Sequence, residues 1–365
     1  MSRIIAIGTA VPEFSTEQSV ILEFMHAAYN DDTASRKLNV LFNHSGISTR
    51  HSAIPDFDKT NSASVFFNGT QNKTTVEDRL NVFKEKAIPL AITAIKNAFI
   101  EINIKISDFE ITHLITVSCT GLYAPGMDAQ LMEQLNLPDD IFHTAVNFLG
   151  CNAAFHALKI ADMITKSDNN AKVLIVCTEL CTLHFQPKNN HDNLLSNTIF
   201  GDGAAAVIIT SDNYAKHHKH KGLAIDGFYS LLLHKGKDLM SWDITPTNFG
   251  MKLDAKIPDF IGSEVNGIVS KACSKLNILP ESISKWAIHP GGKKILDTIQ
   301  QKLQLNSESL AYSYKVLDEY GNMSSPTILF VLNELMKAEH HQDETIFSIG
   351  FGPGLSIETA LLSYA

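Results

Sequence analysis

Short apolar runs rich in β-branched residues alternate with amphipathic helical patterns along this chain, and the alternation occurs twice. In the first part, strands are predicted over 3–8, 112–117, 144–148, 172–177 and 204–210, and helices over 76–100, 127–135 and 152–165. In the second part, strands are predicted over 222–232, 286–289, 345–351 and 355–362, and helices over 257–276, 293–303 and 326–337. Apolar strands between helices are typical of buried sheets, so the chain is predicted to be an α/β protein.

The second series of elements repeats the first, with only the polar stretch 212–221 between them. We therefore predict two related halves, one at 1–212 and one at 213–365. Each half contains a strand that runs into a glycine turn and then a helix, with Cys151 at one turn and His289 at the other. Because functional groups of open α/β sheets gather at the carboxyl ends of strands, two such turns facing each other would form one site between the halves.

Composition excludes several classes of protein. The net charge is −9 and no basic run exceeds a few residues, so binding to nucleic acid or to an anionic membrane has no electrostatic support. No stretch approaches the ~18 apolar residues of a membrane span, and the first apolar run is too short for a signal peptide. We expect a cytoplasmic protein.

The cysteines are odd in number and widely spaced, which argues for thiols rather than a disulfide framework. They are Cys119, Cys151, Cys177, Cys181 and Cys273. No second pair completes a zinc-type spacing with Cys177 and Cys181, so no metal is expected.

Cys151 is the candidate nucleophile. It follows Gly150 and precedes an alanine-rich helical pattern, so its sulfur should lie at a helix N-terminus, where the helix dipole favours a thiolate. A lone cysteine in apolar sequence is more often a buried structural residue. The glycine turn and the two candidate partners favour the nucleophile here.

His289 and Asn322 are the candidate partners. His289 ends an apolar strand and precedes Pro290-Gly291-Gly292, where it could keep a thiol ionised and donate to a thioester oxygen. Asn322 precedes Ser324-Ser325-Pro326, which is typical of a helix start with proline at the first helical position. A fixed amide there suits an oxyanion. The alternatives are a core histidine and an ordinary turn asparagine.

Five strings in order resemble the type III polyketide synthases, the chalcone synthase family. They are Gly150-Cys151 with the following alanines, and the strings at 200–207, 289–292, 320–325 and 350–355. The resemblance implies a thiolase-like fold, with two related halves in an αβαβα arrangement, and a homodimer. It also implies that Cys151 carries the starter and growing chain, and that His289 and Asn322 stabilise the enolate formed when malonyl-CoA loses carbon dioxide. Iterative Claisen condensations and cyclisation would follow, making the chain an acyltransferase that needs no cofactor beyond its CoA thioester substrates.

The resemblance also assigns a substrate pocket. Phe200 matches the gatekeeping phenylalanine and Glu179 the cavity glutamate, while Ala124 matches a position that extends into the neighbouring subunit. The other pocket residues implied are Cys119, Thr120, His184, Phe249, Met251, Gly352, Pro353 and Gly354. From the residues alone, core packing rivals the gate role of Phe200, and an exposed strand-end carboxylate rivals the pocket role of Glu179.

The mouth of the site departs from the family, which binds the CoA phosphates through basic residues in its N-terminal helical region. Here that region offers few cations, and the candidates are Arg36, Lys37, Lys293 and Lys294. A starter delivered by an acyl carrier protein is therefore an alternative to an acyl-CoA.

Three other functions compete with iterative synthesis. A ketoacyl carrier protein synthase III shares the fold and triad but condenses once, a non-catalytic thiolase-fold partner would bind without condensing, and a hydrolase would release free acid. We favour an acyl starter, long-chain ones included, released as an alkylpyrone or alkylresorcinol, and the alternative is a malonyl-primed naphthalene-type product. Cavity shape decides between these products.

Overall fold

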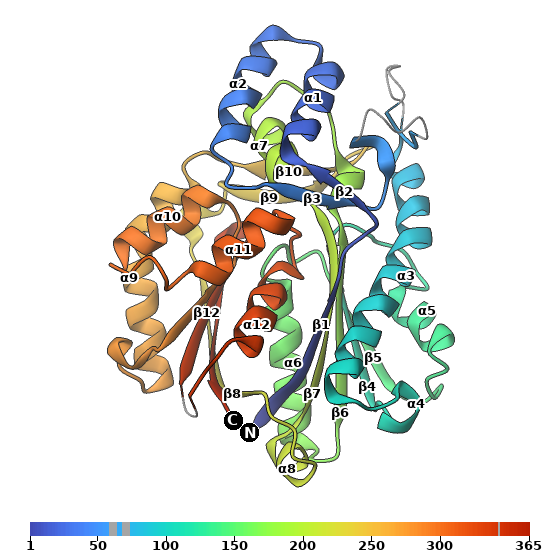
Figure 1. Cartoon of the computed structure of the whole chain (residues 1–365), viewed down its shortest axis with the longest axis vertical. Helices are drawn as coiled ribbons and strands as arrows, with labels where there is room; N and C mark the ends of the chain where they lie inside the picture. Colours follow the sequence, from blue (N-terminus) through green and yellow to red (C-terminus); the bar gives the residue numbers. More distant parts are fainter. Residues whose placement is uncertain (58–63, 68–73, 342–343) are drawn as a thin grey trace.

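The protein is built on one nine-stranded mixed sheet that is sharply divided into two wings (Figure 1). The computed structural model describes residues 1–57, 64–67, 74–341 and 344–365. The strand order is β11-β12-β13-β8-β1-β7-β6-β4-β5. The N-terminal wing contains β1 (Ser2–Ala10), β4 (His113–Ser118), β5 (Phe142–Asn147), β6 (Lys172–Leu180) and β7 (Asp202–Ser211), and the C-terminal wing contains β8 (Leu223–Leu232), β11 (Lys285–Ile288), β12 (Thr345–Gly352) and β13 (Ser356–Tyr364).

The two wings repeat one pattern of strands. In the N-terminal wing, β4 pairs with β6 in parallel, and β6–β7 and β7–β1 are antiparallel pairs. In the C-terminal wing, β11 likewise pairs with β12 in parallel, and β12–β13 and β13–β8 are antiparallel pairs. Within the described part of the sheet, the strands of the two wings pair through a short antiparallel ladder between Ser2–Ile4 of β1 and 223–225 of β8. The N-terminal wing alone adds a further parallel strand, β5, at its edge. The division between residues 212 and 213 stays a prediction, because the sheet runs on through this ladder.

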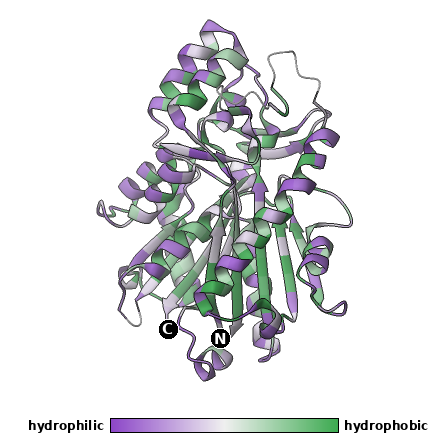
Figure 2. Cartoon of the chain, turned by 45° about the vertical axis from the view of Figure 1, so that its right-hand side comes forward, coloured by the Kyte–Doolittle hydropathy of each residue, from purple (hydrophilic) through white to green (hydrophobic). Residues whose placement is uncertain are grey.

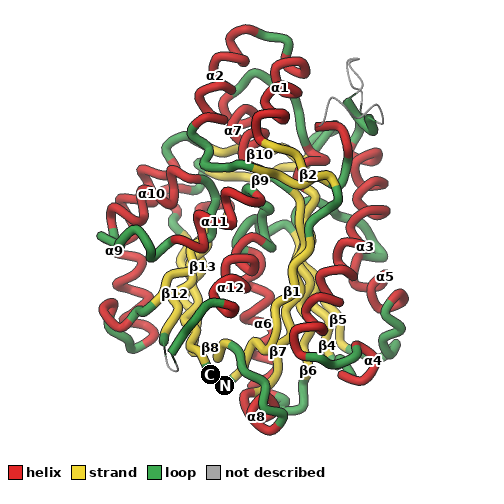
Figure 3. The backbone as a smooth tube through the Cα atoms, in the orientation of Figure 1, coloured by secondary structure: helices red, strands yellow, loops and turns green. Residues whose placement is uncertain are grey.

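Two helices lie between the wings, and five others cover the outer faces of the sheet (Figure 3). The inner pair is α6 (Ala153–Ser167) and α12 (Thr327–Lys337). On the N-terminal wing the outer helices are α3 (Val76–Ile102), α4 (Ile106–Phe109) and α5 (Met127–Gln134), and on the C-terminal wing they are α9 (Ile257–Leu276) and α10 (Lys293–Lys302). Helix α11 (Ala311–Tyr320) packs against α12, and the short α8 (Asp212–His217) follows β7. The layers are therefore αβαβα, the thiolase-like arrangement that was predicted.

Apart from β5 and the later part of β8, the strands of the nine-stranded sheet bury both of their faces, which explains their continuous apolar sequences. On β7, Ala205, Val207 and Ile209 face the inner helices, whereas Ala204, Ala206 and Ile208 face the outer layer. The hydropathy view shows the same division, with hydrophobic colour in the strands and hydrophilic colour on the outer helices (Figure 2). Each predicted strand and helix agrees with an observed element to within about three residues.

A cap at one end of the sheet was not predicted from the sequence. It consists of β2 (Phe14–Glu17), α1 (Gln18–Tyr29), α2 (Asp32–Asn43), β3 (Thr49–Ser52), α7 (His191–Ile199), β9 (Met240–Ile244) and β10 (Phe249–Leu253). These elements are short, and their strands form two separate two-stranded sheets. The cap lies over the carboxyl ends of β4, β5 and β6, where the first catalytic candidate is located.

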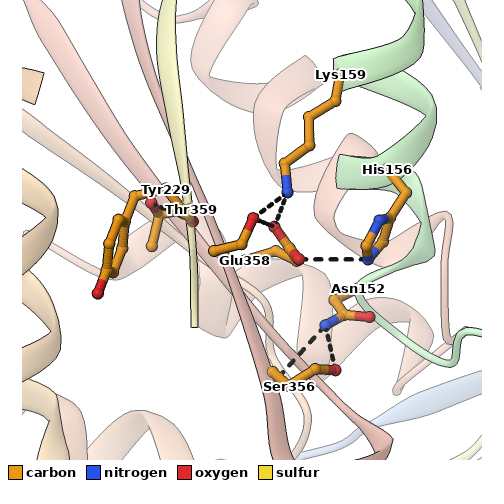
Figure 4. A network of polar contacts seen from close by, with 8 residues as sticks. Asn152, His156, Lys159, Tyr229, Ser356, Glu358 and Thr359 are labelled. Atoms are coloured by element: carbon orange, nitrogen blue, oxygen red, sulfur yellow. Dashed lines mark hydrogen bonds and ion pairs between the residues drawn. The ribbon is translucent and has the colours of Figure 1, made fainter. Parts of the chain in front are cut away.

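Buried polar contacts fix α6 against the C-terminal wing (Figure 4). The carboxylate of Glu358 on β13 is buried, pairs with Lys159 of α6, and lies 3.3 Å from Nε2 of His156. Ser230 of β8 donates to the same carboxylate at 2.9 Å. Nearer the site, Nδ2 of Asn152 donates to Oγ of Ser356 at 2.9 Å. The helix that follows Cys151 is thus fixed to both wings.

Replacing Lys159 by Met removes the cation that pairs with Glu358 while keeping most of the apolar side chain. Loss of one partner of a buried ion pair costs several kcal/mol, but Lys159 is 20% exposed, so we expect K159M to lower the free energy of unfolding by about 1–3 kcal/mol. Urea denaturation should show a lower midpoint with an unchanged slope. The double variant K159M/E358Q should recover at least half of the loss, and a double variant as unstable as K159M would contradict this account.

Candidate active site

The turn between β5 and α6 holds Cys151 at the end of the sheet. Phe148 and Gly150 both have left-handed backbone, with φ of 61° and 81°. A Cβ atom on Gly150 would lie 2.3 Å from Cδ of Pro353, so only glycine fits this position. Cys151 follows at 7% exposure, and α6 begins two residues later at Ala153. The thiol is buried close to the helix N-terminus, as the glycine turn predicted.

Asn322 reaches this turn from the other half of the chain. Its backbone N–H donates to Ile199 at 2.8 Å and its carbonyl accepts from Gly201 at 3.0 Å, which joins it to the Phe200 segment. Its Oδ1 accepts from the Ser324 N–H at 2.8 Å. Sγ of Cys151 lies 3.9 Å from Nδ2 and 4.0 Å from Oδ1 of this side chain. A fixed amide therefore lies against the thiol.

The start of α12 differs from the prediction by one residue. Pro326 is the N-cap residue and the helix begins at Thr327, so proline does not occupy the first helical position. Ser324 just before it has a left-handed φ of 61°, a strained conformation for a residue with a side chain. This bend turns Ser324 into the cavity beside Cys151.

His289 follows β11 and is held by its backbone. Its N–H donates to the carbonyl of Ile349 and its carbonyl accepts from Gly291, both at 2.9 Å. The side chain is 1% exposed and neither ring nitrogen has a hydrogen-bond partner among the described residues. Nδ2 of Asn322 lies 3.5 Å from the Gly291 carbonyl, so the amide contacts both this turn and Cys151. An unpartnered buried imidazole is costly, and it is free to bond a ligand.

Burial opposes the ionisation that the helix N-terminus favours. It raises the pKa of the Cys151 thiol to about 11, although hydrogen bonds from Ser324 and Asn322 act in the opposite direction. Burial also lowers the pKa of His289 to about 3. Burial therefore keeps the Cys151 thiol protonated and the His289 imidazole uncharged near neutral pH. A proton that leaves Cys151 needs an acceptor, and an uncharged imidazole such as that of His289 has one unprotonated nitrogen.

One cavity opens onto Cys151 and runs beneath the cap. Besides Cys151, seven predicted pocket residues line it: Cys119, Thr120, His184, Phe200, Phe249, Met251 and Pro353. Neither His289 nor Asn322 is among the residues that line it, but the Asn322 amide contacts both Cys151 and the carbonyl of Gly291 in the His289 turn. The structure therefore brings most of the predicted pocket together around one thiol.

An aromatic wall closes one side of the cavity. The His184 ring stacks on Phe249 with centroids 4.4 Å apart, and Trp242 meets both rings edge to face. Nδ1 of His184 accepts from the Phe249 N–H at 3.1 Å, so its Nε2 carries the proton and donates to the Thr120 carbonyl at 2.8 Å. Burial lowers the pKa of His184 to about 3. A neutral, fully bonded histidine acts as a wall residue rather than an acid or a base.

Glu179 lies behind the cavity wall rather than in it, which corrects its expected place in the pocket. Its buried carboxylate accepts from the N–H groups of Cys119 and Thr120, from the Thr120 hydroxyl at 2.7 Å and from the Ser325 hydroxyl at 2.6 Å. Burial raises its pKa, and these donors oppose the rise. The carboxylate holds the Cys119–Thr120 wall against the segment that follows Asn322.

Ala124 and two of the glycines also lie outside this cavity. Ala124 is exposed in a separate surface hollow with His143 and Ala145, while Gly352 and Gly354 flank Pro353 without lining the cavity. Gly352 packs closely against Asn152 instead, since a Cβ atom at this position would lie 2.4 Å from Oδ1 of Asn152.

The four cations expected at the mouth lie on the surface and do not line the cavity. Arg36 and Lys37 are exposed on α2. Lys293 pairs with Asp297 at 2.7 Å, and Lys294 lies 3.8 Å from Asp259. Their role in binding CoA stays a prediction.

Several lining residues were missed from the sequence. They include Met25 of α1, Arg50 of β3, Cys181, Trp242 and Ser324. Ser324 carried a signal, because it stands two residues after Asn322. The others come from the cap or from a turn that no local pattern marks.

Neither a metal site nor a membrane-spanning helix is found in the part of the chain that the structure describes. No three His, Cys, Asp or Glu side chains there are grouped to hold a metal ion. No helix there is both long and apolar enough to cross a membrane. All five cysteines are free.

Comparison with known proteins identifies the family. Residues 1–213 match the family described as chalcone and stilbene synthases, N-terminal domain, and residues 230–364 match the C-terminal domain of the same family. The chain belongs to the chalcone and stilbene synthase family. The family and the thiolase-like fold predicted from the five strings are thereby confirmed.

Individual relatives and solved structures agree. The alpha-pyrone synthesis polyketide synthase-like Pks18 of Mycobacterium tuberculosis is 28% identical over 357 residues, 97% of this chain and 89% of that protein. The 3,5-dihydroxyphenylacetyl-CoA synthase of Streptomyces toyocaensis is 28% identical over 366 residues, 99% of this chain and 90% of that protein. The crystal structure of PKS-I from the brown alga Ectocarpus siliculosus aligns with a TM-score of 0.90 and 27% identity, covering 100% of this chain and 98% of that one.

Replacing His289 by Gln tests whether the imidazole takes the thiol proton. Without it, the high pKa of Cys151 means that alkylation by iodoacetamide should be at least tenfold slower at pH 7 than in the wild type. In the variant, the rate should rise about tenfold per pH unit between pH 7 and 10, because the pKa of about 11 lies above that window.

Intact-protein mass spectrometry would follow the adduct, with Cys151→Ala as the control that identifies it. Equal rates for wild type and His289→Gln across this pH range would show that His289 does not receive the proton.

Proposed function

We propose that this chain is a type III polyketide synthase in which Cys151 carries the acyl chain, His289 moves protons and Asn322 holds an oxyanion. The enzyme accepts an acyl starter, extends it with malonyl-CoA by iterative Claisen condensations, and cyclises the product. The observation that carries this proposal is that an oriented amide contacts both the buried thiol at the cavity and the turn of His289, whose imidazole is unpartnered among the described residues. Membership of the family supports it.

Loading begins with attack by Sγ of Cys151 on the carbonyl carbon of the starter thioester. His289 takes the thiol proton and returns it to the departing thiolate of the carrier. The Nδ2 group of Asn322, 3.9 Å from Sγ in the free site, is placed to donate to an oxygen on the reacting carbon. The starter is then a thioester on Cys151.

Extension begins when the bound malonyl thioester loses carbon dioxide. The electrons of the broken C–C bond form an enolate, whose oxygen accepts from Asn322 and from a protonated nitrogen of His289. The enolate carbon attacks the thioester on Cys151 and displaces the Cys151 thiolate, which leaves the lengthened chain on CoA. That thiolate then attacks the new thioester, and CoA departs as the chain returns to the same sulfur. Two neutral donors suit this step because they stabilise the enolate without titrating.

Malonyl-CoA and an acyl thioester are thus the proposed partners, and no further cofactor is required. The starter arrives on CoA or on an acyl carrier protein, and the cations at positions 36, 37, 293 and 294 are the proposed phosphate contacts. A single-condensation ketoacyl carrier protein synthase III is set aside, because both halves match the chalcone and stilbene synthase family instead.

Replacing Cys151 by Ala should separate decarboxylation from extension. The variant cannot hold a chain, so products extended by two or more ketide units should fall below detection, at least a thousandfold. Because His289 and Asn322 remain, conversion of malonyl-CoA to acetyl-CoA should persist.

Mass spectrometry of products from malonyl-CoA with acetyl-, hexanoyl-, lauroyl- and aromatic acyl-CoA would measure both activities. The matched control, Asn322→Ala, should lose decarboxylation as well. A wild-type enzyme that released only free acid or a product of one condensation would overturn the proposal.

The assembly we propose is a homodimer formed through the free edge of the N-terminal wing. β5 is the edge strand there, and Phe142 on it is 54% exposed. Leu149 after the strand and Met163 on the adjoining α6 are exposed as well. An unprotected edge strand with large exposed apolar side chains favours pairing with the same strand of a second chain. Ala124, in the hollow beside β5, would then lie near the partner subunit.

Replacing Phe142 by Asp should weaken this association at least tenfold, because two carboxylates would be buried in a symmetric interface. Size-exclusion chromatography with light scattering over a dilution series would measure it. Ile100→Asp is the matched control, since Ile100 is equally apolar and 71% exposed on the outer helix α3. A dimer equally stable in both variants would place the interface elsewhere.

A further inference from the structure

The last turn of α7 is joined directly to the segment that carries Asn322. The backbone N–H of Asn322 donates to the Ile199 carbonyl at 2.8 Å, and its own carbonyl accepts from the Gly201 N–H at 3.0 Å. The two segments approach closely, since a Cβ atom on Gly321 would lie 2.7 Å from the carbonyl oxygen of Ile199. The end of α7 therefore sets the position of the Asn322 backbone.

Two side chains of the cap bond the other carbonyls at this end of α7. Nη1 of Arg50 in β3 donates to the carbonyls of Asn197 and Phe200, both at 2.8 Å. Nε2 of Gln18, the first residue of α1, donates to the Thr198 carbonyl at 2.9 Å. The last carbonyls of a helix have no partners within it, so they need partners from outside. Arg50 and Gln18 supply such partners and anchor the end of α7 to the cap.

Arg50 and Gln18 also fix each other. Nε of Arg50 donates to Oε1 of Gln18 at 2.8 Å, and both residues are buried. The acceptors that the described chain offers to the Arg50 guanidinium are all uncharged. Burial lowers the pKa of Arg50 to about 9, and the charge of Asp202 opposes this shift. A cation buried against neutral acceptors is costly, although the negative end of the helix dipole favours it. The structure accepts this cost at the helix end that holds Asn322.

The side-chain contacts of Asn322 orient its amide but do not set its distance from Cys151. Oδ1 of Asn322 accepts from the N–H of Ser324, which belongs to the same segment. Sγ of Cys151 lies 3.9 Å from Nδ2 of Asn322 and belongs to the turn before α6. A shift at the end of α7 would move the amide relative to the thiol. A misplacement of about 1 Å can cost about a hundredfold in rate.

We propose that Arg50 and Gln18 are positioning residues, which act through the end of α7 to keep the Asn322 amide in reach of an oxygen on the carbon that reacts with Cys151. The inference rests on the proposed function, since it assumes that Asn322 holds an oxyanion. Neither side chain has to touch the reacting thioester for this role. Loss of their bonds should therefore slow the chemical step and leave the binding of a short thioester nearly unchanged.

Acylation of Cys151 by acetyl-CoA, measured by intact-protein mass spectrometry without malonyl-CoA, tests the inference separately from condensation. Arg50→Met removes the donors and keeps an apolar side chain. It should lower the maximal rate of acylation at least tenfold, while the half-saturating concentration of acetyl-CoA changes by less than threefold. Arg50→Lys, which keeps a cation at the helix end, should be faster than Arg50→Met. Gln18→Leu should lower the maximal rate at least threefold, and it tests the same role if Arg50→Met does not fold.

A double-mutant cycle shows whether Arg50 acts through Asn322. Asn322→Ala should slow acylation about a hundredfold, because it removes a donor to the oxyanion. Arg50→Met should then slow the Asn322→Ala protein by less than threefold. Effects that multiply, or an Asn322→Ala protein as fast as the wild type, would overturn the positioning role. An unchanged maximal rate with a raised half-saturating concentration would overturn it too, because the guanidinium would then act on the substrate.

Asn190→Ala is the matched control, because Asn190 caps the other end of α7, where its side chain accepts from the Asn193 N–H at 2.9 Å. Its loss should lower the melting temperature but leave the rate of acylation within about twofold. An equal loss of rate in the control and in Arg50→Met would show that only the stability of α7 matters, which would overturn the inference.

The same measurements separate this inference from the proposed function. If acylation and the cycle behave as expected but malonyl-CoA yields no extended product, the positioning role stands and the proposed function fails. If the wild type makes extended products and a folded Arg50→Met protein is acylated at the wild-type rate, the proposed function stands and the positioning role fails.

Discussion

The packing of α6 and α12 between the two wings is the constraint on which the site depends. Each helix starts at the same end of the molecule, just after Cys151 in one case and just after Asn322 in the other. Alanines at 153, 154, 157 and 161 and the apolar face of α12 fill one continuous inner core with residues from both wings. Because this core fixes both helices, it also fixes the two turns that precede them. The third turn, which carries His289, follows a strand of the same sheet.

The fold was predictable because, in both wings, the local sequence pattern shows which segments form strands and which form the covering helices. Strands buried on two faces are continuous apolar runs, and helices over them repeat every three or four residues. The turns that carry Cys151 and Asn322 were predictable for a related reason: Gly150 and Gly321 have positive φ, and a Cβ atom on them would lie 2.3 and 2.7 Å from neighbouring atoms, so they mark these turns in the sequence. Such positions tolerate no other residue, and this makes the turns recognisable.

The cap and the exact cavity wall were not predictable in the same way. Helices α1 and α2 have 12 residues each, no fewer than the predicted α12, but they pack against each other and against α7 rather than over the long buried strands of the sheet. Glu179 shows, for a single residue, that local sequence does not reveal contacts with distant segments. Its strand-end position is clear from sequence, but whether its carboxylate faces the cavity depends on donors from Cys119, Thr120 and Ser325, which come from distant segments.

Hydrogen-bond satisfaction differs among the buried polar groups of the site. Both ring nitrogens of His289 lack a partner among the described residues, and so do Nη2 of Arg50 and Oγ of Ser196, which line the cavity. Ser52, Thr182 and His184 line the same cavity but have bonded their polar atoms to the protein. Unused donors in a buried site are costly to folding, so they are retained where a ligand supplies the missing acceptor.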